Sequence, residues 1–175
     1  MVASLIYGSG LTLSECVALR LRDVDYEKSL VFVRKKAGEI VRETIFPKCL
    51  TEELQNSLRE KYGETELDEN CFLFPTRIYK AAGIESAPQR HLHLNSVQKA
   101  MKEASGFAGL TKTATCMMLR HSFAVHLLES GVSLKAVQRL LGHARVEQTT
   151  VYLQLLRSIP RAPISPLDIL YGHDV

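Results

Sequence analysis

The chain has 175 residues, 46% of them hydrophobic, which suits one globular domain large enough to bury a core. A net charge of +3 is too small to indicate nucleic-acid binding by itself, and no apolar run approaches the roughly 18 residues that a membrane span needs. The four cysteines include no C-x-x-C pair, so we expect reduced thiols, a cytoplasmic protein and no metal site.

The first ten residues form a short apolar stretch that runs directly into a predicted helix. Apolar residues recur on one stripe of residues 13–21, and Thr12 or Ser14 is suited to cap this helix. A free-standing domain more often begins with a polar segment. We therefore expect that the chain begins inside a domain whose earlier part is missing, the alternative being that residues 2–7 are simply the first buried turn.

Two short segments after this helix are rich in β-branched and aromatic residues, which favours strands. They cover residues 29–34 and 41–46, with Gly38 in the polar turn between them. Residues 23–25 are expected only to break the preceding helix. The pattern predicts one antiparallel β-hairpin with a basic tip, followed by a helix over residues 51–62.

The rest of the chain is predicted to be mainly helical, with a loop at residues 63–70 and an irregular connection at residues 76–93. The expected helices cover residues 95–105, 116–130, 133–141 and 146–157. Gly131 and Gly142 stand where helix C-caps adopt left-handed backbone. The fold class is thus α+β, mostly helical, with one small antiparallel sheet, and one domain over residues 1–175 is sufficient.

Three short motifs in the last third of the chain carry the candidate chemistry. They are residues 119–124 (LRHSFA), 140–143 (LLGH) and 149–152 (TTVY). Two helices separated by a glycine are a weak indication alone. The combination is much more specific, because His143 stands nine residues before Tyr152.

Together these motifs resemble the tyrosine recombinase family, which includes phage integrases, Xer recombinases and integron integrases. The family pattern is H-x-L-R-H, then L-G-H, then a tyrosine nine residues later. Residues 7–15 (YGSGLTLSE) are similar to the family's Y-G-x-G-x-R-x-S-E, and residues 165–167 (SPL) are similar to the ends of integron integrases. The resemblance covers essentially the whole chain and implies the catalytic-domain fold of this family.

The resemblance implies site-specific DNA recombination or integration, as carried out for mobile elements. A tyrosine attacks a phosphodiester of double-stranded DNA and leaves a 3′-phosphotyrosyl link and a free 5′-hydroxyl, without ATP, metal or other cofactor. The transition state gains negative charge, so cationic donors are needed at its oxygens. The family supplies two arginines, histidines and a hairpin lysine that protonates the leaving oxygen.

Four residues match catalytic positions of the family. Tyr152 matches the nucleophile, Arg120 the second arginine, His143 the histidine of L-G-H, and His121 a histidine that supports the site. Each has a plainer alternative. Tyr152 could belong to an ordinary amphipathic helix, His143 could end a helix, and Arg120 with His121 could be a structural pair.

Three catalytic positions do not match. The first arginine falls on Thr12, whose neutral hydroxyl cannot make a bidentate charged contact to phosphate. The histidine two positions before Leu119 falls on Met117, a thioether with no proton to give. The hairpin lysine falls on Ala37, although a register shift would place Lys36 there. Because one lost donor lowers a rate by roughly 10²–10³, we expect weak or no recombination.

Several basic residues are candidates for contacts to DNA phosphates, the alternative being an ordinary solvated surface. They are Lys35, Arg42, Lys112 and Arg145. The family's N-terminal DNA-clamping domain, the core-binding domain, is expected to be missing, so DNA binding should be weak and sensitive to salt. Residues 167–171 are the candidate segment for docking on a second copy or on a full-length recombinase.

Two other functions stay open at this point. The first is a DNA-binding or recombinase-partner protein that uses the same fold without catalysis. The second is a helix-turn-helix regulator formed by residues 116–142. That interpretation leaves the hairpin and Tyr152 unexplained, and it needs a second helix richer in polar, base-reading side chains.

Overall fold

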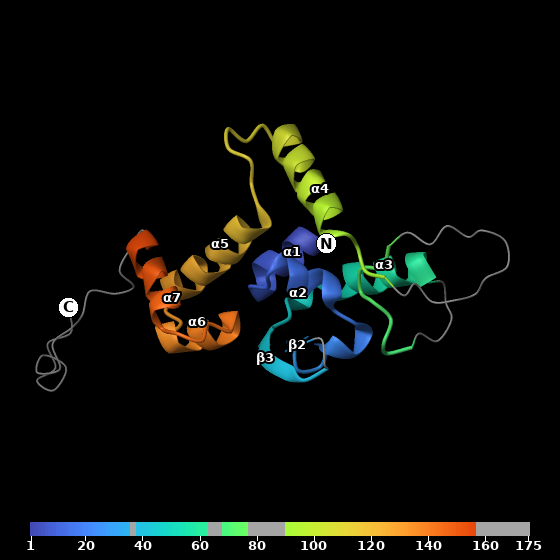
Figure 1. Ribbon diagram of the computed structural model, residues 1–175, viewed down its shortest axis with the longest axis horizontal. Helices are drawn as coiled ribbons and strands as arrows, with labels where there is room; N and C mark the ends of the chain where they lie inside the picture. The colour runs from blue at the N-terminus through green and yellow to red at the C-terminus, as the bar shows by residue number, and fades with distance from the viewer. Residues whose placement is uncertain (36–37, 63–67, 77–89, 157–175) are drawn as a thin grey trace, which may run out of the picture.

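The computed structural model describes residues 1–35, 38–62, 68–76 and 90–156, and Figure 1 shows their arrangement. The protein is mostly helical with one small sheet, which confirms the α+β prediction. In chain order the α-helices are α1 (Val2–Ser9), α2 (Leu13–Ala18), α3 (Thr51–Tyr62), α4 (Leu94–Phe107), α5 (Cys116–Glu129), α6 (Leu134–Leu141) and α7 (Glu147–Thr150). The short 3-10 helices are η1 (Leu21–Asp23), η2 (Lys48–Leu50) and η3 (Val151–Leu155).

The sheet has three antiparallel strands in the order β1-β2-β3. Strands β2 (Leu30–Arg34) and β3 (Ile40–Ile45) form the expected hairpin, with an irregular register between Val33 and Arg34. The third strand, β1 (Val24–Asp25), was predicted only as a helix break. It is too short for side-chain alternation to reveal it, and it forms through pairing with β2.

The predicted helix over residues 13–21 is wrong at its C-terminal end. Helix α2 stops at Ala18, and Leu19 has extended backbone. The residues that follow pair with a distant segment instead, because the Leu73 N–H donates to the Leu19 carbonyl and the Leu21 N–H donates to the Cys71 carbonyl, both at 2.9 Å. Pairing across some 50 residues therefore overrides the local helical pattern.

The predicted helix over residues 146–157 is also corrected. The structure has the four-residue helix α7, followed by the tighter turns of η3, which carry Tyr152. The three preceding helices begin and end within two residues of the expected positions. Gly131 and Gly142 have φ values of +85° and +71°, which confirms the predicted left-handed helix ends.

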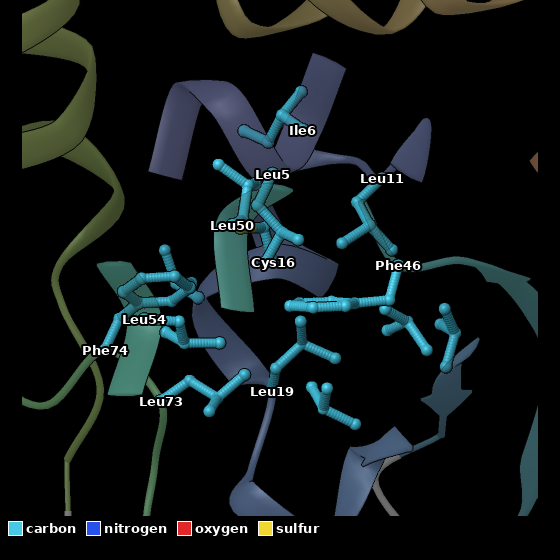
Figure 2. Close-up of a cluster of buried hydrophobic side chains, with 14 of the residues drawn as sticks. Leu5, Ile6, Leu11, Cys16, Leu19, Phe46, Leu50, Leu54, Leu73 and Phe74 are labelled. Carbon is cyan, nitrogen blue, oxygen red and sulfur yellow. The ribbon is translucent and has the colours of Figure 1, made fainter. Parts of the chain in front are cut away.

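Two hydrophobic clusters hold the elements together. The larger one lies around α1, whose Leu5 and Ile6 are fully buried, and Figure 2 shows it reaching from α2 to α3 and the sheet. The smaller one joins α5, α6 and η3, and consists of Phe123, Ala124, Leu128, Val137, Leu141 and Tyr152. Helix α1 packs on α5, so the first apolar stretch of the chain connects both clusters.

None of the described helices is long and apolar enough to cross a membrane. The cysteines Cys16, Cys49, Cys71 and Cys116 are free thiols. Most of the expected irregular connection, residues 77–89, and the candidate docking segment, residues 167–171, lie outside the described residues.

Candidate active site

Arg120 stands at the centre of the site, in the second turn of α5. Helix α5 begins after Thr115, whose hydroxyl accepts a hydrogen bond from the Met118 N–H at 3.2 Å. The Arg120 guanidinium is 7% exposed and donates to the Gly10 carbonyl at 2.9 Å and to the Leu141 carbonyl at 2.7 Å. These contacts bind the end of α1 and the end of α6 to α5.

Glu15 supplies the negative charge of the site. Its Oε2 atom accepts hydrogen bonds from Arg42 Nη2 at 2.8 Å, Arg120 Nη1 at 3.3 Å and the Thr12 N–H at 2.7 Å. Burial raises the pKa of Glu15, but the charge of Arg42 and the hydrogen bonds from Thr12 and Arg42 together hold that pKa below its usual value. Two arginines therefore share one carboxylate and keep a net positive charge.

Sequence reasoning assigned no role to Glu15. The available signal was the S-E pair that ends residues 7–15, and the position three residues after Thr12 that a capping box requires. The structure has this capping box, with the Thr12 hydroxyl accepting from the Glu15 N–H at 3.2 Å. Thr12 thus has a structural role at the N-terminus of α2.

Arg42, a candidate for a contact to DNA phosphate with a solvated surface as the alternative, has its side chain inside the protein. It projects from β3, and its side chain is only 6% exposed. Besides Glu15, it contacts the Leu140 carbonyl through Nη1. Arg42 and Leu140 are 98 residues apart in the sequence, so no local pattern indicated that this side chain is buried.

Tyr152 and His121 form a direct hydrogen bond, with Tyr152 Oη 2.8 Å from His121 Nδ1. Tyr152 is 4% exposed, and burial raises the pKa of its phenol, with the charge of Arg120 acting in the opposite direction. Burial, and then the charge of Arg120, lowers the pKa of His121 below its usual 6.5. Both groups are therefore neutral at pH 7, which leaves the imidazole able to accept a proton.

His143 contacts the ring of Tyr152. Its imidazole stacks on Tyr152, with ring centroids 6.3 Å apart and planes inclined by 12°, and its Nδ1 is 3.0 Å from the buried hydroxyl of Thr149. Burial, followed by the charges of Arg120 and Arg42, lowers the pKa of His143. Thr149 was not predicted as a site residue. The sequence indicated it only as a member of the motif at residues 149–152.

A cavity of about 410 Å³ opens beside Arg120, between α2, α4 and the first turn of α5. Thr12 and Met117 both line it, so the two positions where the sequence lacks the expected cationic groups face one space. Met117 is 52% exposed, so it borders the cavity without being part of the core. The other lining residues are Leu13, Gln98, Met101, Lys102, Thr113, Ala114, Thr115 and Cys116.

The remaining candidates lie at the surface or outside the described residues. Lys35, Lys112 and Arg145 are exposed, and Lys35 lies 3.8 Å from Glu39. Lys36 and Ala37 lie outside the described residues. Among the described residues, no group of three or more His, Cys, Asp or Glu side chains is arranged to hold a metal ion.

The model of the Phage integrase family matches residues 1–158. The chain therefore belongs to the phage integrase family, and the resemblance inferred from its motifs is confirmed. Membership of the phage integrase family also argues against the helix-turn-helix regulator, an interpretation that left Tyr152 and the hairpin unexplained.

Individual relatives support the same assignment. An integrase/recombinase of Escherichia coli is 31% identical over 196 residues, which cover 97% of this chain and 58% of that protein. Tyrosine recombinase XerA of Thermococcus onnurineus is 34% identical over 157 residues, covering 89% of this chain and 50% of that protein. The chain thus spans about half the length of the curated relatives it matches.

Solved structures confirm the fold. The Tn1549 transposon integrase, in complex with circular intermediate DNA, superposes with a TM-score of 0.65 and 18% sequence identity. The match covers 99% of this chain and 56% of that one. At this identity the likeness describes the shared architecture, and the chemistry has to be argued from this chain's own residues.

Proposed function

We propose that this chain is the catalytic part of a site-specific DNA recombinase that acts on double-stranded DNA, with Tyr152 as the nucleophile. The observation that carries the proposal is the 2.8 Å contact between Tyr152 Oη and His121 Nδ1, beside Arg120 and His143. A nucleophile needs a base within hydrogen-bond reach, and the phosphate needs cationic donors next to that pair. The DNA bound to the Tn1549 integrase supports the choice of substrate.

In the proposed step, Tyr152 Oη attacks the phosphorus and its proton passes to the neutral His121. The new bond joins the tyrosine oxygen to the 3′-phosphate, and the bond from phosphorus to the 5′-oxygen breaks. The leaving oxygen takes a proton and becomes a 5′-hydroxyl. Lys36, which lies between β2 and β3 in the sequence, is our candidate for that proton donor, by analogy with the family's hairpin lysine.

Arg120 and His143 are the groups proposed to stabilise the transition state. Arg120 carries a permanent charge, and His143 offers a ring N–H. Thr12 and Met117, which face the same cavity, add no charge to it. Each missing preorganised donor lowers a rate by roughly 10²–10³, so we propose that the chain cleaves DNA weakly. Lys35, Lys112 and Arg145 are proposed phosphate contacts, whose loss should reduce the salt dependence of binding.

A covalent-trapping assay tests the proposal. Nicked duplexes taken from the DNA flanking the gene are incubated with the protein, and a denaturing gel is examined for a slowly migrating protein–DNA band. The matched control is Tyr152→Phe, which keeps the aromatic ring and removes the attacking oxygen. We expect a faint band that is absent from the control.

A second function is favoured by the neutral side chains at two of the expected catalytic positions, Thr12 and Met117, which line the cavity. With Thr12 engaged in a helix cap and Met117 unable to donate, the chain would bind DNA or a full-length recombinase without cleaving. Binding in a native gel at low salt with no covalent band would establish this alternative and contradict catalysis. We also propose that the chain associates with a second copy of itself, which sedimentation would test. The DNA sequence around the gene would test whether it belongs to an integron or another mobile element.

A further inference from the structure

Arg42 connects the sheet to the helix turn that carries His143. It extends from β3, and its guanidinium divides its donors between the Glu15 carboxylate, at 2.8 Å, and the backbone carbonyl of Leu140. We propose that Arg42 is a positioning residue that fixes His143 against Tyr152. The inference rests on the proposed function for its catalytic meaning, but its structural content can be tested without DNA cleavage.

Two arginines bond the backbone carbonyls at the end of α6. Carbonyls in the last turn of a helix have no partner within the helix and carry partial negative charge. Two successive carbonyls are held here by arginines from different elements, Leu140 by Arg42 and Leu141 by Arg120. The end of α6 is thereby fixed to both β3 and α5.

The second support is the glycine between α6 and His143. Gly142 has φ +71°, and a Cβ added to it would lie 2.4 Å from Arg42 Cδ and 2.9 Å from Arg42 Nε. The arginine stem therefore packs directly on the turn, so a side chain at position 142 would have to displace it. The next residue is His143, whose N–H donates to the Gln138 carbonyl at 3.1 Å. Movement of the Arg42 stem is thus transmitted to the backbone of His143.

The third support is the shared carboxylate. Glu15 Oε2 contacts both Arg42 and Arg120. The charge of Arg120 in turn acts to lower the pKa values of His121, His143 and Tyr152. The guanidinium fork is needed because one planar group must reach a carboxylate and a carbonyl in different directions. A lysine ammonium keeps the charge but lacks this fixed geometry.

The experiment compares Arg42→Met and Arg42→Lys with Arg34→Met. Arg34 is the matched control, because it lies on the neighbouring strand β2 and also bonds a carboxylate and a carbonyl, those of Asp23 at 2.7 Å and Gly38 at 2.9 Å. The readout is the imidazole NMR spectrum of His143, followed through a pH titration of the free protein. The charged or titratable groups that act on His143 are Arg120, Arg42 and His121.

Arg42→Met should move the His143 resonances and raise its midpoint toward 6.5, because one positive neighbour is lost and the turn is released. Arg42→Lys should move the resonances while keeping most of the depressed midpoint. Arg34→Met should leave both unchanged. In a cleavage-competent background, the single-turnover rate should fall about 10²-fold in Arg42→Met with DNA affinity unchanged, as expected for a misplaced catalytic group.

The proposal is overturned if His143 in Arg42→Met has the spectrum and midpoint of the unaltered protein. Should Arg42→Met fail to fold, Arg42→Lys decides the matter, because unchanged His143 resonances in that variant contradict a role for the guanidinium fork. Absence of any covalent DNA band would contradict the proposed catalysis and leave the NMR result standing. Failure of the positioning role of Arg42 and failure of the proposed catalysis are therefore distinguishable.

Discussion

The two walls of the candidate site differ in how they are built. On the α5–η3 side, Tyr152 contacts His121, and Thr149 contacts His143. On the α2–α4 side, a cavity of about 410 Å³ is bordered by Lys102 and by Thr12 and Met117, which are neutral. The α5–η3 side is assembled by hydrogen bonds between its own residues. The α2–α4 side has a cavity, and the two positions on it where the family pattern implies an arginine and a histidine hold Thr12 and Met117.

The two walls are connected through Glu15, which belongs to α2 and bonds Arg120 of α5. Arg120 is held by the Gly10 and Leu141 carbonyls, and Glu15 has Arg42 as a second cationic partner. Arg120 on the nucleophile side is therefore anchored by two backbone carbonyls and by Glu15, and the Thr12 side chain acts on it only through the cap of α2. Cationic or proton-donating side chains placed at positions 12 and 117 should therefore supply the missing groups while Arg120, His121, His143 and Tyr152 keep their positions.

The largest effect is expected from Thr12→Arg combined with Met117→His. Both side chains would enter the cavity beside Arg120, which offers about 410 Å³. Each restored donor should raise the cleavage rate by roughly 10²–10³, with the two effects not strictly additive. The measurement is single-turnover formation of the covalent Tyr152–DNA complex.

Ser14→Arg with Met118→His is the matched control for this gain. It adds the same groups one or two residues along the same helices, at exposed positions that do not line the cavity. This control should stay at the starting rate. A folded, DNA-bound Thr12→Arg/Met117→His protein that remains inert would show that the assignment of these positions to the family's arginine and histidine is wrong.

A smaller effect, about 10²-fold, is expected when His121→Gln removes the base from the rescued protein. Because its pKa is depressed by burial and Arg120, His121 stays neutral at pH 7 and gains a proton only in more acidic solution. Cleavage should therefore be constant through neutral pH and fall as the pH drops through the lowered pKa of His121. His121→Gln should abolish this acidic decline.

The control for His121 lies on the same helix. His126 also bonds a tyrosine, with its Nδ1 2.9 Å from Tyr7 Oη, but that tyrosine is not the proposed nucleophile. His126→Gln should keep the rate and the acidic decline. An unchanged pH profile in His121→Gln would assign the proton transfer to another group.

Most of the elements could be predicted because their signals are local. The hairpin strands, the helices from α3 to α6 and the left-handed glycines follow from periodicity, β-branched residues and caps within short windows. The motif spacing was also sufficient to bring Arg120, His121, His143 and Tyr152 together, because the compact helices α5 to α7 are consecutive in the chain.

The Glu15 network could not be predicted in this way. Glu15 and Arg42 are 27 residues apart, and Glu15 and Arg120 are 105 residues apart, so no local pattern connects them. The early end of α2 has the same origin, since residues 19–21 pair with residues 71–73. Long-range pairing thus decides both where elements stop and which arginine is buried.

The smallest effect concerns the stability of Thr12 variants, and it has the opposite sign to the gain in cleavage. The Thr12 hydroxyl accepts from the Glu15 N–H in the capping box of α2, so Thr12→Ala should lower the free energy of unfolding by about 1 kcal/mol, whereas Thr12→Ser should change it little. Urea unfolding measures the difference, with Thr115→Ala, at the cap of α5, as the comparison.

Thr12→Arg removes the same cap, so the variant with the greatest expected gain in cleavage should also lose about this much stability. Position 12 would then have two incompatible uses, a helix cap in this chain and a phosphate contact in the restored site. An unaltered urea midpoint in Thr12→Ala would mean that the cap contributes nothing measurable. In that case, the neutral Thr12 side chain would make no measurable contribution to stability that offsets the missing charge at this position.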